Sequence, residues 1–240
     1  MTIKLTISYD GSKFFGSQIQ LNKDTVHGRI QLALKTLGIN SKIAFSGRTD
    51  KDVHASKQVI SFEVPSYWKD INKLEEKLKS FMPNSIKIHS IEEKQNVFHA
   101  RFSAKKRSYR YIISKKQLTA FNSSYMAYYD DINEELIKTA TKEFIGIHDF
   151  EYFHKKGSEP LSTIREIYDI KFYSHKDIYV FKFTANSYLR SQIRMMVYIL
   201  IEISKGNITI EQLKEQLLKK AIHTRRLASP YGLYLSRIYY

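Results

Sequence analysis

The chain has 240 residues, 42% of them hydrophobic, with 9 glycines, 4 prolines and no cysteine. This composition is typical of a globular protein without long disordered linkers, and the lack of cysteine excludes disulfides, thiolate metal sites and cysteine nucleophiles. Lysine and arginine total 39 against 24 acidic residues, a net charge of +15 that favours a polyanion such as nucleic acid as partner. A lysine-rich surface without such a partner is the alternative.

No signal peptide or membrane anchor is expected. The first residues lack the apolar core and cleavage site of a signal peptide. The longest apolar stretch, residues 195–203, contains Glu202 and is too short to cross a bilayer. We therefore expect a soluble protein of the cytoplasm.

The first half of the chain predicts strands and helices in mixed order. Apolar and polar residues alternate over residues 3–9, which predicts a strand, and a loop with two glycines follows. Helical spacing then predicts a helix over residues 26–37, capped by Thr25 or Asp24 and ended by Gly38. The other expected elements are strands near 42–45, 60–64, 86–91 and 108–113, and a helix over 71–81 behind Asp70.

The second half also predicts a mixture of strands and helices, but its sequence does not visibly repeat that of the first half. We expect helices near 136–144 and 189–200, strands over 163–173 and 178–185, and a closing strand in 232–240. Thr209 and Gln212 form a capping-box pattern that opens a further helix, and "GIHDF" at residues 146–150 is interpreted as a turn. Mixed strands, helices and hairpins predict an α+β fold.

The segment "SGRTDKDVHA", residues 46–55, contains the first candidate for chemistry. Asp50 there is either a turn aspartate that bonds its own backbone, or a reactive carboxylate kept ionised by Arg48. The residue pattern alone favours the turn aspartate. Neither a Walker loop nor a dinucleotide-binding glycine motif occurs, and His148 and His154 lie in no recognised metal motif, so we expect no cofactor and no metal.

Seven segments, in their order along the chain, favour the reactive-carboxylate interpretation of Asp50. They are "YDGSKFFGSQIQ", "TVHGRIQLAL", "SGRTDKDVHA", "FHARFSAKKRSYRYII", "GIHDF", "ANSYLRSQIRMMV" and "ASPYGLYLSRIYY". Together they resemble the TruA family of tRNA pseudouridine synthases over almost the whole chain. The resemblance implies two similar α/β-sandwich halves, residues 1–105 and 106–240, that share a central, mainly antiparallel sheet flanked by helices and form one catalytic unit. It also implies a homodimer that isomerises uridine to pseudouridine in the anticodon stem-loop of tRNA, at positions thirty-eight to forty, without cofactor or metal.

The resemblance assigns roles to five residues. Asp50 matches the family's catalytic aspartate, and Arg48 matches an arginine that fills the space left by the flipped base. Tyr109 matches a tyrosine that stacks on the target uracil. Arg194 matches a basic partner of the aspartate, and Leu233 matches an apolar residue of the pocket wall. From the pattern alone, Tyr109 is a core aromatic of a strand and Arg194 lies on the polar face of a helix.

Two positions depart from the family pattern. Asp52 stands where the family commonly has glycine, and Ser17 stands where it commonly has tryptophan. Two other classes of function are compatible with the charge. The first is a non-catalytic RNA-binding or tRNA-chaperone protein on the same scaffold, which has no need of Asp50. The second is a metal-dependent nuclease, which would require clusters of acidic residues.

Overall fold

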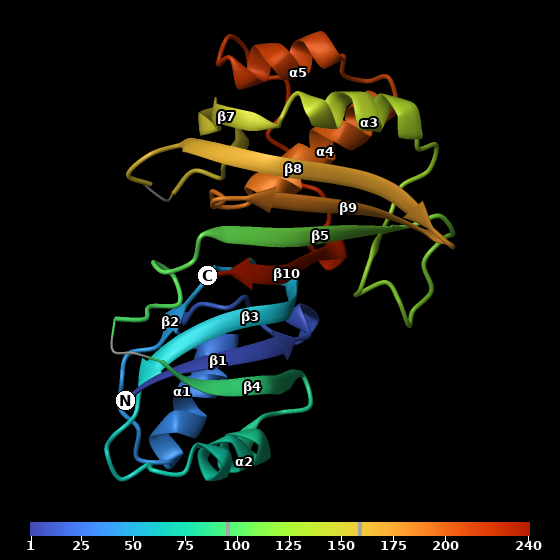
Figure 1. Ribbon diagram of the computed structural model, residues 1–240. Helices are drawn as coiled ribbons and strands as arrows, with labels where there is room; N and C mark the ends of the chain where they lie inside the picture. The colour runs from blue at the N-terminus through green and yellow to red at the C-terminus, as the bar shows by residue number, and fades with distance from the viewer. Residues whose placement is uncertain (95–96, 158–159) are drawn as a thin grey trace. The chain divides into compact units, whose positions relative to one another are not determined.

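The computed structural model describes residues 1–94, 97–157 and 160–240, and it divides into two compact units. Unit 1 holds Met1–Lys105 together with Tyr234–Tyr240, and unit 2 holds Lys106–Leu233 (Figure 1). The sequence-based division placed all of residues 106–240 in the second half. The closing segment clusters with unit 1 because its strand pairs there, with Tyr234 opposite His54.

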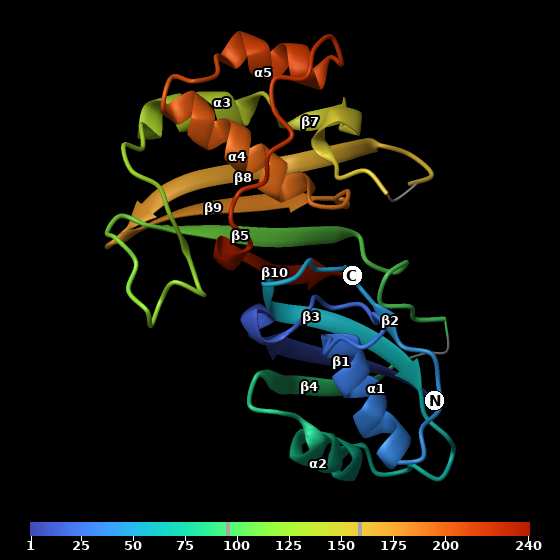
Figure 2. The same cartoon turned by 180° about the vertical axis from the view of Figure 1, so that it is seen from behind.

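Unit 1 is built on a sheet with the strand order β4-β1-β3-β10. Strand β1 pairs antiparallel with both β3 and β4, while β10 pairs parallel with β3 and the short β2 pairs antiparallel with β3. Helix α1 lies across one face of this sheet, and α2 lies beside β4 (Figure 2). The bounds are β1 Thr2–Tyr9, η1 Gly11–Lys13, α1 Val26–Thr36, β2 Ala44–Phe45, β3 His54–Glu63, α2 Ile71–Phe81, β4 Ile86–Lys94 and β10 Leu233–Tyr239.

The helix caps of unit 1 follow from local sequence. Thr25 is the N-cap of α1, and its side chain accepts a hydrogen bond from the Gly28 N–H. Asp70 caps α2 in the same way. These caps satisfy backbone donors that have no partner inside the helix. Of the two caps predicted for α1, Thr25 is confirmed.

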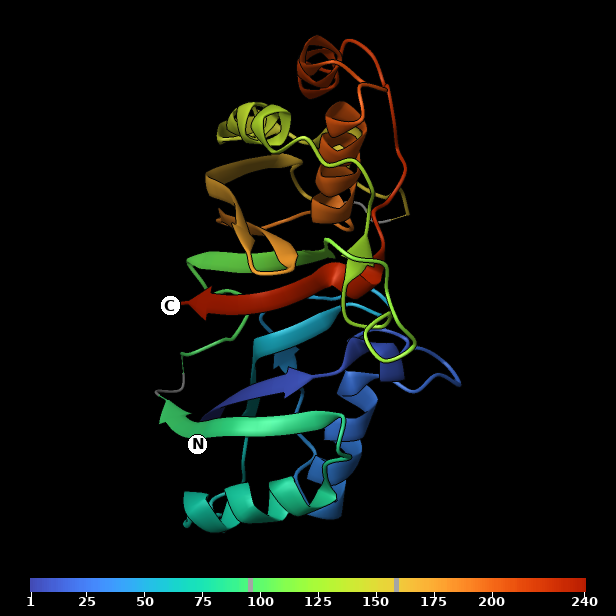
Figure 3. The same ribbon diagram turned by 90° about the vertical axis from the view of Figure 1, so that its right-hand side faces the viewer.

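The main strands of unit 2 have the order β5-β9-β8-β7, and neighbouring strands in this series are antiparallel. Strand β6 pairs parallel with β5. Helix α4 packs on one face of this sheet, with α3 and α5 nearby (Figure 3). The bounds are β5 Lys106–Ser114, β6 Ala127–Tyr128, α3 Glu134–Lys142, β7 Gly146–Asp149, η2 Glu151–Phe153, β8 Ile164–His175, β9 Ile178–Ala185, α4 Gln192–Ser204, α5 Ile210–Leu217 and η3 Pro230–Gly232.

Two local predictions in unit 2 are wrong. The segment "GIHDF" is not a turn, because Gly146–Asp149 pairs with β8 as strand β7 and His148 lies opposite Arg165. Helix α4 begins at Gln192 rather than at residue 189, because Ser191 has a φ of +59°, outside the right-handed helical region. The capping box at Thr209 and Gln212 is confirmed, with both of its hydrogen bonds present.

Both units are α+β, which confirms the predicted class. Across the described parts of the chain, no helix has the length and apolar character needed to cross a membrane. In α4 the inward residues are fully buried, among them Met196, Val197, Ile199 and Leu200. This helix therefore supplies much of the core of unit 2.

Candidate active site

Arg48 and Asp50 lie on the loop between β2 and β3 in unit 1, which we call the Asp50 loop and define as residues 46–53. Arg48 is exposed and Asp50 is half-buried. The loop turns tightly after Asp50, since the Val53 N–H donates to the Asp50 carbonyl over 3.2 Å. Asp52 occupies this turn with a φ of +66°, in the left-handed region that favours glycine.

A buried polar network under the loop holds its backbone in place. The Gln58 side chain on β3 donates to the Gly47 carbonyl over 2.8 Å and accepts from the Ser46 hydroxyl over 2.6 Å. The Tyr9 hydroxyl at the end of β1 lies 2.8 Å from the Thr49 hydroxyl. Tyr9 and Gln58 are almost completely buried, so these hydrogen bonds are shielded from competing water. The residue before Asp50 is thus fixed through its side chain.

Burial decides the ionisation of Tyr9. Loss of hydration raises the pKa of the Tyr9 phenol to about 12, although hydrogen bonds with Thr49 and Gln58 act in the opposite direction. The phenol is therefore neutral near pH 7 and keeps a proton for hydrogen bonding. Tyr9 and Gln58 belong to the support of the site and were not singled out from sequence, because no motif or spacing links residues 9, 47, 49 and 58.

The first loop of unit 1, residues 10–25, packs against the Asp50 loop along its backbone. The Ser17 N–H donates to the Thr49 carbonyl over 3.1 Å, and the Thr49 N–H donates to the Ser17 hydroxyl over 2.8 Å. A Cβ on Gly16, whose φ is +90°, would lie 2.9 Å from the Thr49 carbonyl oxygen. A Cβ on Gly11 would lie 2.1 Å from the Val53 carbonyl oxygen. The glycines in "YDGSKFFG" are thus required by close contact between two backbones.

His54 closes the network at the start of β3. Its Nδ1 accepts a hydrogen bond from the Gly11 N–H over 3.0 Å, and its ring stacks on Tyr234 with centroids 4.6 Å apart. The Asp10 carboxylate lies 3.4 Å from the same nitrogen. Because Nδ1 accepts from Gly11, this nitrogen does not donate to Asp10 in the geometry described, and the short distance is not a salt bridge. His54 is a buried structural residue that ties the two loops to β10.

The remaining predicted site residues, Tyr109, Arg194 and Leu233, belong to unit 2. Tyr109 lies on β5 opposite Phe183, is 7% exposed, and packs edge-on against Tyr188 with centroids 5.2 Å apart. Arg194 lies in the first turns of α4, where its Nε donates to the Ala228 carbonyl over 2.8 Å. The Ala228 N–H returns a bond to the Arg194 carbonyl over 3.0 Å.

Leu233 is the last residue of unit 2 and the first residue of β10, directly after η3, and it is 6% exposed. Gly232, immediately before it, approaches β5 so closely that a Cβ would lie 2.7 Å from the Ile112 carbonyl oxygen. The Tyr111 hydroxyl donates to the Ser229 carbonyl over 2.9 Å and so fixes the start of the same segment. Burial raises the pKa of Tyr111 well above its ordinary value, with a smaller lowering by the charge of Arg194.

The structure thus brings Arg48 and Asp50 together on one loop, and it places Tyr109, Arg194 and Leu233 in the other unit. The roles that the resemblance gives to these five residues stay predictions. For the ranges 1–94, 97–157 and 160–240, no group of three or more histidine, aspartate or glutamate side chains could hold a metal ion.

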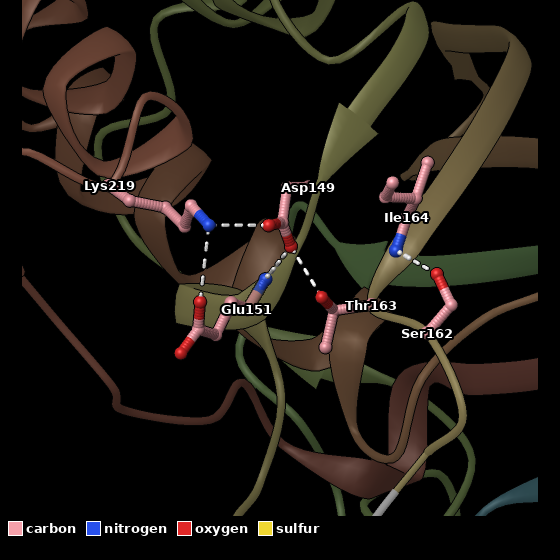
Figure 4. Close-up of polar contacts among 6 residues, drawn as sticks. All are labelled: Asp149, Glu151, Ser162, Thr163, Ile164 and Lys219. Carbon is pink, nitrogen blue, oxygen red and sulfur yellow. Dashed lines mark hydrogen bonds and ion pairs between the residues drawn. The ribbon is translucent and has the colours of Figure 1, made fainter.

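Another polar cluster in unit 2 has a structural role. Lys219, just after α5, lies 2.6 Å from the Asp149 carboxylate and 3.3 Å from that of Glu151 (Figure 4). Thr163 donates to Asp149 over 2.5 Å, and the Glu151 N–H donates to it over 3.1 Å. The desolvation of Asp149 raises its pKa, but the hydrogen bonds from Lys219 and Thr163 outweigh this and lower the pKa overall. The cluster ties the end of α5 to β7 and β8.

A family model and several curated relatives match this chain. A family model described as tRNA pseudouridine synthase matches residues 5–103 and 140–240. A tRNA pseudouridine synthase A of Wolinella succinogenes is 40% identical over 237 residues, covering 99% of this chain and 94% of the relative. The enzyme of that name from Campylobacter jejuni strain RM1221 is 38% identical over 100% of both chains. One from Helicobacter pylori strain P12 is 39% identical, covering 99% of this chain and 98% of its own.

These matches first define a class, that of isomerases that convert uridine to pseudouridine in RNA. Within that class, the chain belongs to the tRNA pseudouridine synthase family. The α+β architecture described above is therefore that of a member of this family.

Proposed function

We propose that this protein isomerises uridine to pseudouridine in the anticodon stem-loop of tRNA, at positions thirty-eight to forty, with Asp50 as the essential carboxylate. The observation that carries the proposal is the match of the full chain to tRNA pseudouridine synthases. Support for Asp50 comes from its loop, which is fixed by buried hydrogen bonds at Gly47 and Thr49 on the N-terminal side of the carboxylate. Such fixing is what a positioned reactive group requires.

The reaction is an isomerisation, so the product nucleotide has the same atomic composition as the uridine. The uridine is first turned out of the RNA stack, which costs a few kcal/mol. The bond between N1 and the sugar then breaks, the base turns, and carbon five bonds to the sugar. The proton from carbon five leaves to solvent and N1 takes one up. Asp50 acts in one of two ways, by attacking the sugar carbon or by removing a sugar proton.

The other predicted site residues bind the substrate nucleotide. Arg48, exposed at the edge of the Asp50 loop, fills the space left by the flipped base. Tyr109 stacks on the uracil, Leu233 supplies apolar surface, and Arg194 provides positive charge for a carboxylate or the RNA. The net charge of +15 supports RNA binding in general. We further propose that the protein acts in the cytoplasm as a homodimer.

The decisive assay is tritium release from tRNA labelled at uracil carbon five. The wild-type protein should release tritium, and Asp50→Asn should abolish release while keeping the affinity for tRNA within about threefold, because asparagine cannot act as base or nucleophile. Asp52→Asn is the matched control, since it makes the same change of charge two residues away and asparagine tolerates a positive φ. Turnover by pure Asp50→Asn would refute the role of Asp50.

The same assay distinguishes the non-catalytic alternative. A wild-type protein that binds tRNA tightly yet releases no tritium would be an RNA-binding protein, and the proposed activity would be wrong. The target positions are tested with anticodon stem-loops that carry uridine at only one of positions thirty-eight, thirty-nine or forty. Release from none of these, but from uridines elsewhere, would refute the anticodon assignment.

A further inference from the structure

Phe15 in the first loop holds two lysine ammonium groups against one ring. Lys23 Nζ lies 4.6 Å and Lys51 Nζ lies 4.8 Å from the centroid of the Phe15 ring. The ring is 39% exposed, whereas the adjacent Phe14 is only 3% exposed and belongs to the core. An aromatic face attracts a cation, so the ring fixes the direction of two otherwise flexible side chains.

The backbone of Phe15 is anchored beside the Asp50 loop. Its N–H donates to the Asp24 carbonyl over 2.8 Å, and the Gln20 side chain donates to its carbonyl. The next residue, Gly16, packs against the backbone of residues 49–51. Lys51 directly follows Asp50 in the chain. Lys51 therefore belongs to the Asp50 loop itself, and Lys23 shares its aromatic ring.

Lys23 and Lys51 supply the positive charge at Phe15. In the described parts of the chain, neither Lys23 nor Lys51 forms an ion pair with a carboxylate, and both are exposed. The nearby Asp24 carboxylate is already engaged by the Arg29 guanidinium over 2.6 Å. Since both ammonium groups lie within about 5 Å of one centroid, their positive charges add at this place on the surface.

We propose that Phe15, Lys23 and Lys51 form a binding site for backbone phosphates of the RNA strand next to the target uridine. The inference rests on the proposed function, because it takes RNA as the substrate. Two ammonium groups supply charge and several donors to phosphate oxygens, and the ring holds them in place before the RNA arrives. Binding at this site brings the strand to the Asp50 loop, so it contributes to substrate affinity and to the position of the nucleotide.

The test measures binding of an anticodon stem-loop RNA at several salt concentrations. Lys23→Gln and Lys51→Gln should each lower the slope of log affinity against log salt by about 0.7 to 0.9, the value for one lost phosphate contact. Phe15→Ala removes no charge, yet we expect it to weaken binding at least threefold, because the two lysines lose their common support. Phe15→Tyr keeps an aromatic face and should bind like the wild type.

Lys77→Gln is the control for general electrostatics. Lys77 is exposed on α2, and the substitution changes the net charge by the same amount as either lysine variant. Wild-type affinity and slope in Phe15→Ala would overturn the proposal. So would lysine variants whose slopes equal that of Lys77→Gln. Thermal denaturation of each variant confirms that it is folded, and the two lysine variants change only exposed side chains.

The outcome is separable from that of the proposed function. Binding is measured without turnover. A smaller slope of log affinity against log salt in the lysine variants therefore supports the phosphate site even if the wild-type protein releases no tritium. Conversely, a wild-type protein that modifies tRNA, combined with an unaffected Phe15→Ala variant, refutes this site alone.

Discussion

Replacement of Ser17 by alanine tests how the Asp50 loop is held. Ser17 is completely buried, and its hydroxyl accepts the Thr49 N–H over 2.8 Å. In Ser17→Ala this backbone donor loses its acceptor in a place without access to water. The reciprocal bond from the Ser17 N–H to the Thr49 carbonyl involves backbone only and survives the substitution.

The size of the effect follows from the unpaired donor. A buried backbone donor without a partner costs about 1–3 kcal/mol, so the free energy of unfolding should fall by about 2 kcal/mol. For a chain of roughly this length, 1 kcal/mol corresponds to about 2–4 °C in Tm, which gives a decrease of about 4–8 °C. Because Asp50 follows Thr49, kcat should also fall, by about tenfold, since a displacement of about 1 Å can cost 10²-fold.

Urea denaturation measures the change in the free energy of unfolding. The change in kcat is measured by tritium release at saturating tRNA, at a temperature where both proteins are folded. Ser80→Ala is the matched control, because Ser80 is exposed on α2 and its hydroxyl donates to the Lys77 carbonyl within the same helix. It should leave both stability and kcat nearly unchanged. A Ser17→Ala protein with wild-type stability would refute the buried hydrogen bond, and a less stable protein with wild-type kcat would refute its role in placing Asp50.

Three further perturbations test the same account of the structure. Asp52→Ala should lower stability by about 1 kcal/mol, while Asp52→Gly should not, because only the alanine is strained at a φ of +66°; equal melting temperatures for the two would contradict the strain. Gly11→Ala should lower stability by about 3 kcal/mol or prevent folding, since its Cβ would lie 2.1 Å from the Val53 carbonyl oxygen, and an unchanged urea midpoint would contradict this contact. Asp149 has a lowered pKa in the folded protein, so its contribution is complete above the ordinary value of 3.8 and is lost as pH falls through the folded pKa. The stability difference between wild type and Asp149→Asn should therefore shrink below about pH 4 in acid titrations of unfolding, and a difference that is constant with pH would contradict the lowered pKa.

The sequence predicted well those elements whose conformation is determined by residues close to them in the chain. The caps Thr25, Asp70 and Thr209 bond backbone donors within the next three residues, so the sequence pattern and the structure share one origin. The alternation in β1 and the stripe of α2 likewise reflect one buried face each. The sequence also placed Arg48 and Asp50 in a polar segment between two strands, and the structure confirms that position.

What the sequence did not predict depends on partners far away in the chain. β7 is a strand because β8 lies beside it, while Gly146 at its start resembles a helix terminator. The support of the Asp50 loop joins residues separated by 40 positions, as in the pair of Tyr9 and Thr49. No local pattern specifies such pairs, since burial and strand register bring them together.

The two departures from the family pattern lie on the two loops that meet at Thr49. Ser17 fills a completely buried position, where its small side chain bonds the backbone of the Asp50 loop instead of packing a large ring. Asp52 adopts a positive φ, a conformation that favours glycine but that aspartate tolerates better than most residues. A hydrogen bond at one position and a tolerated backbone angle at the other therefore support the path of the loop in this chain, and neither residue is a group that the proposed reaction needs.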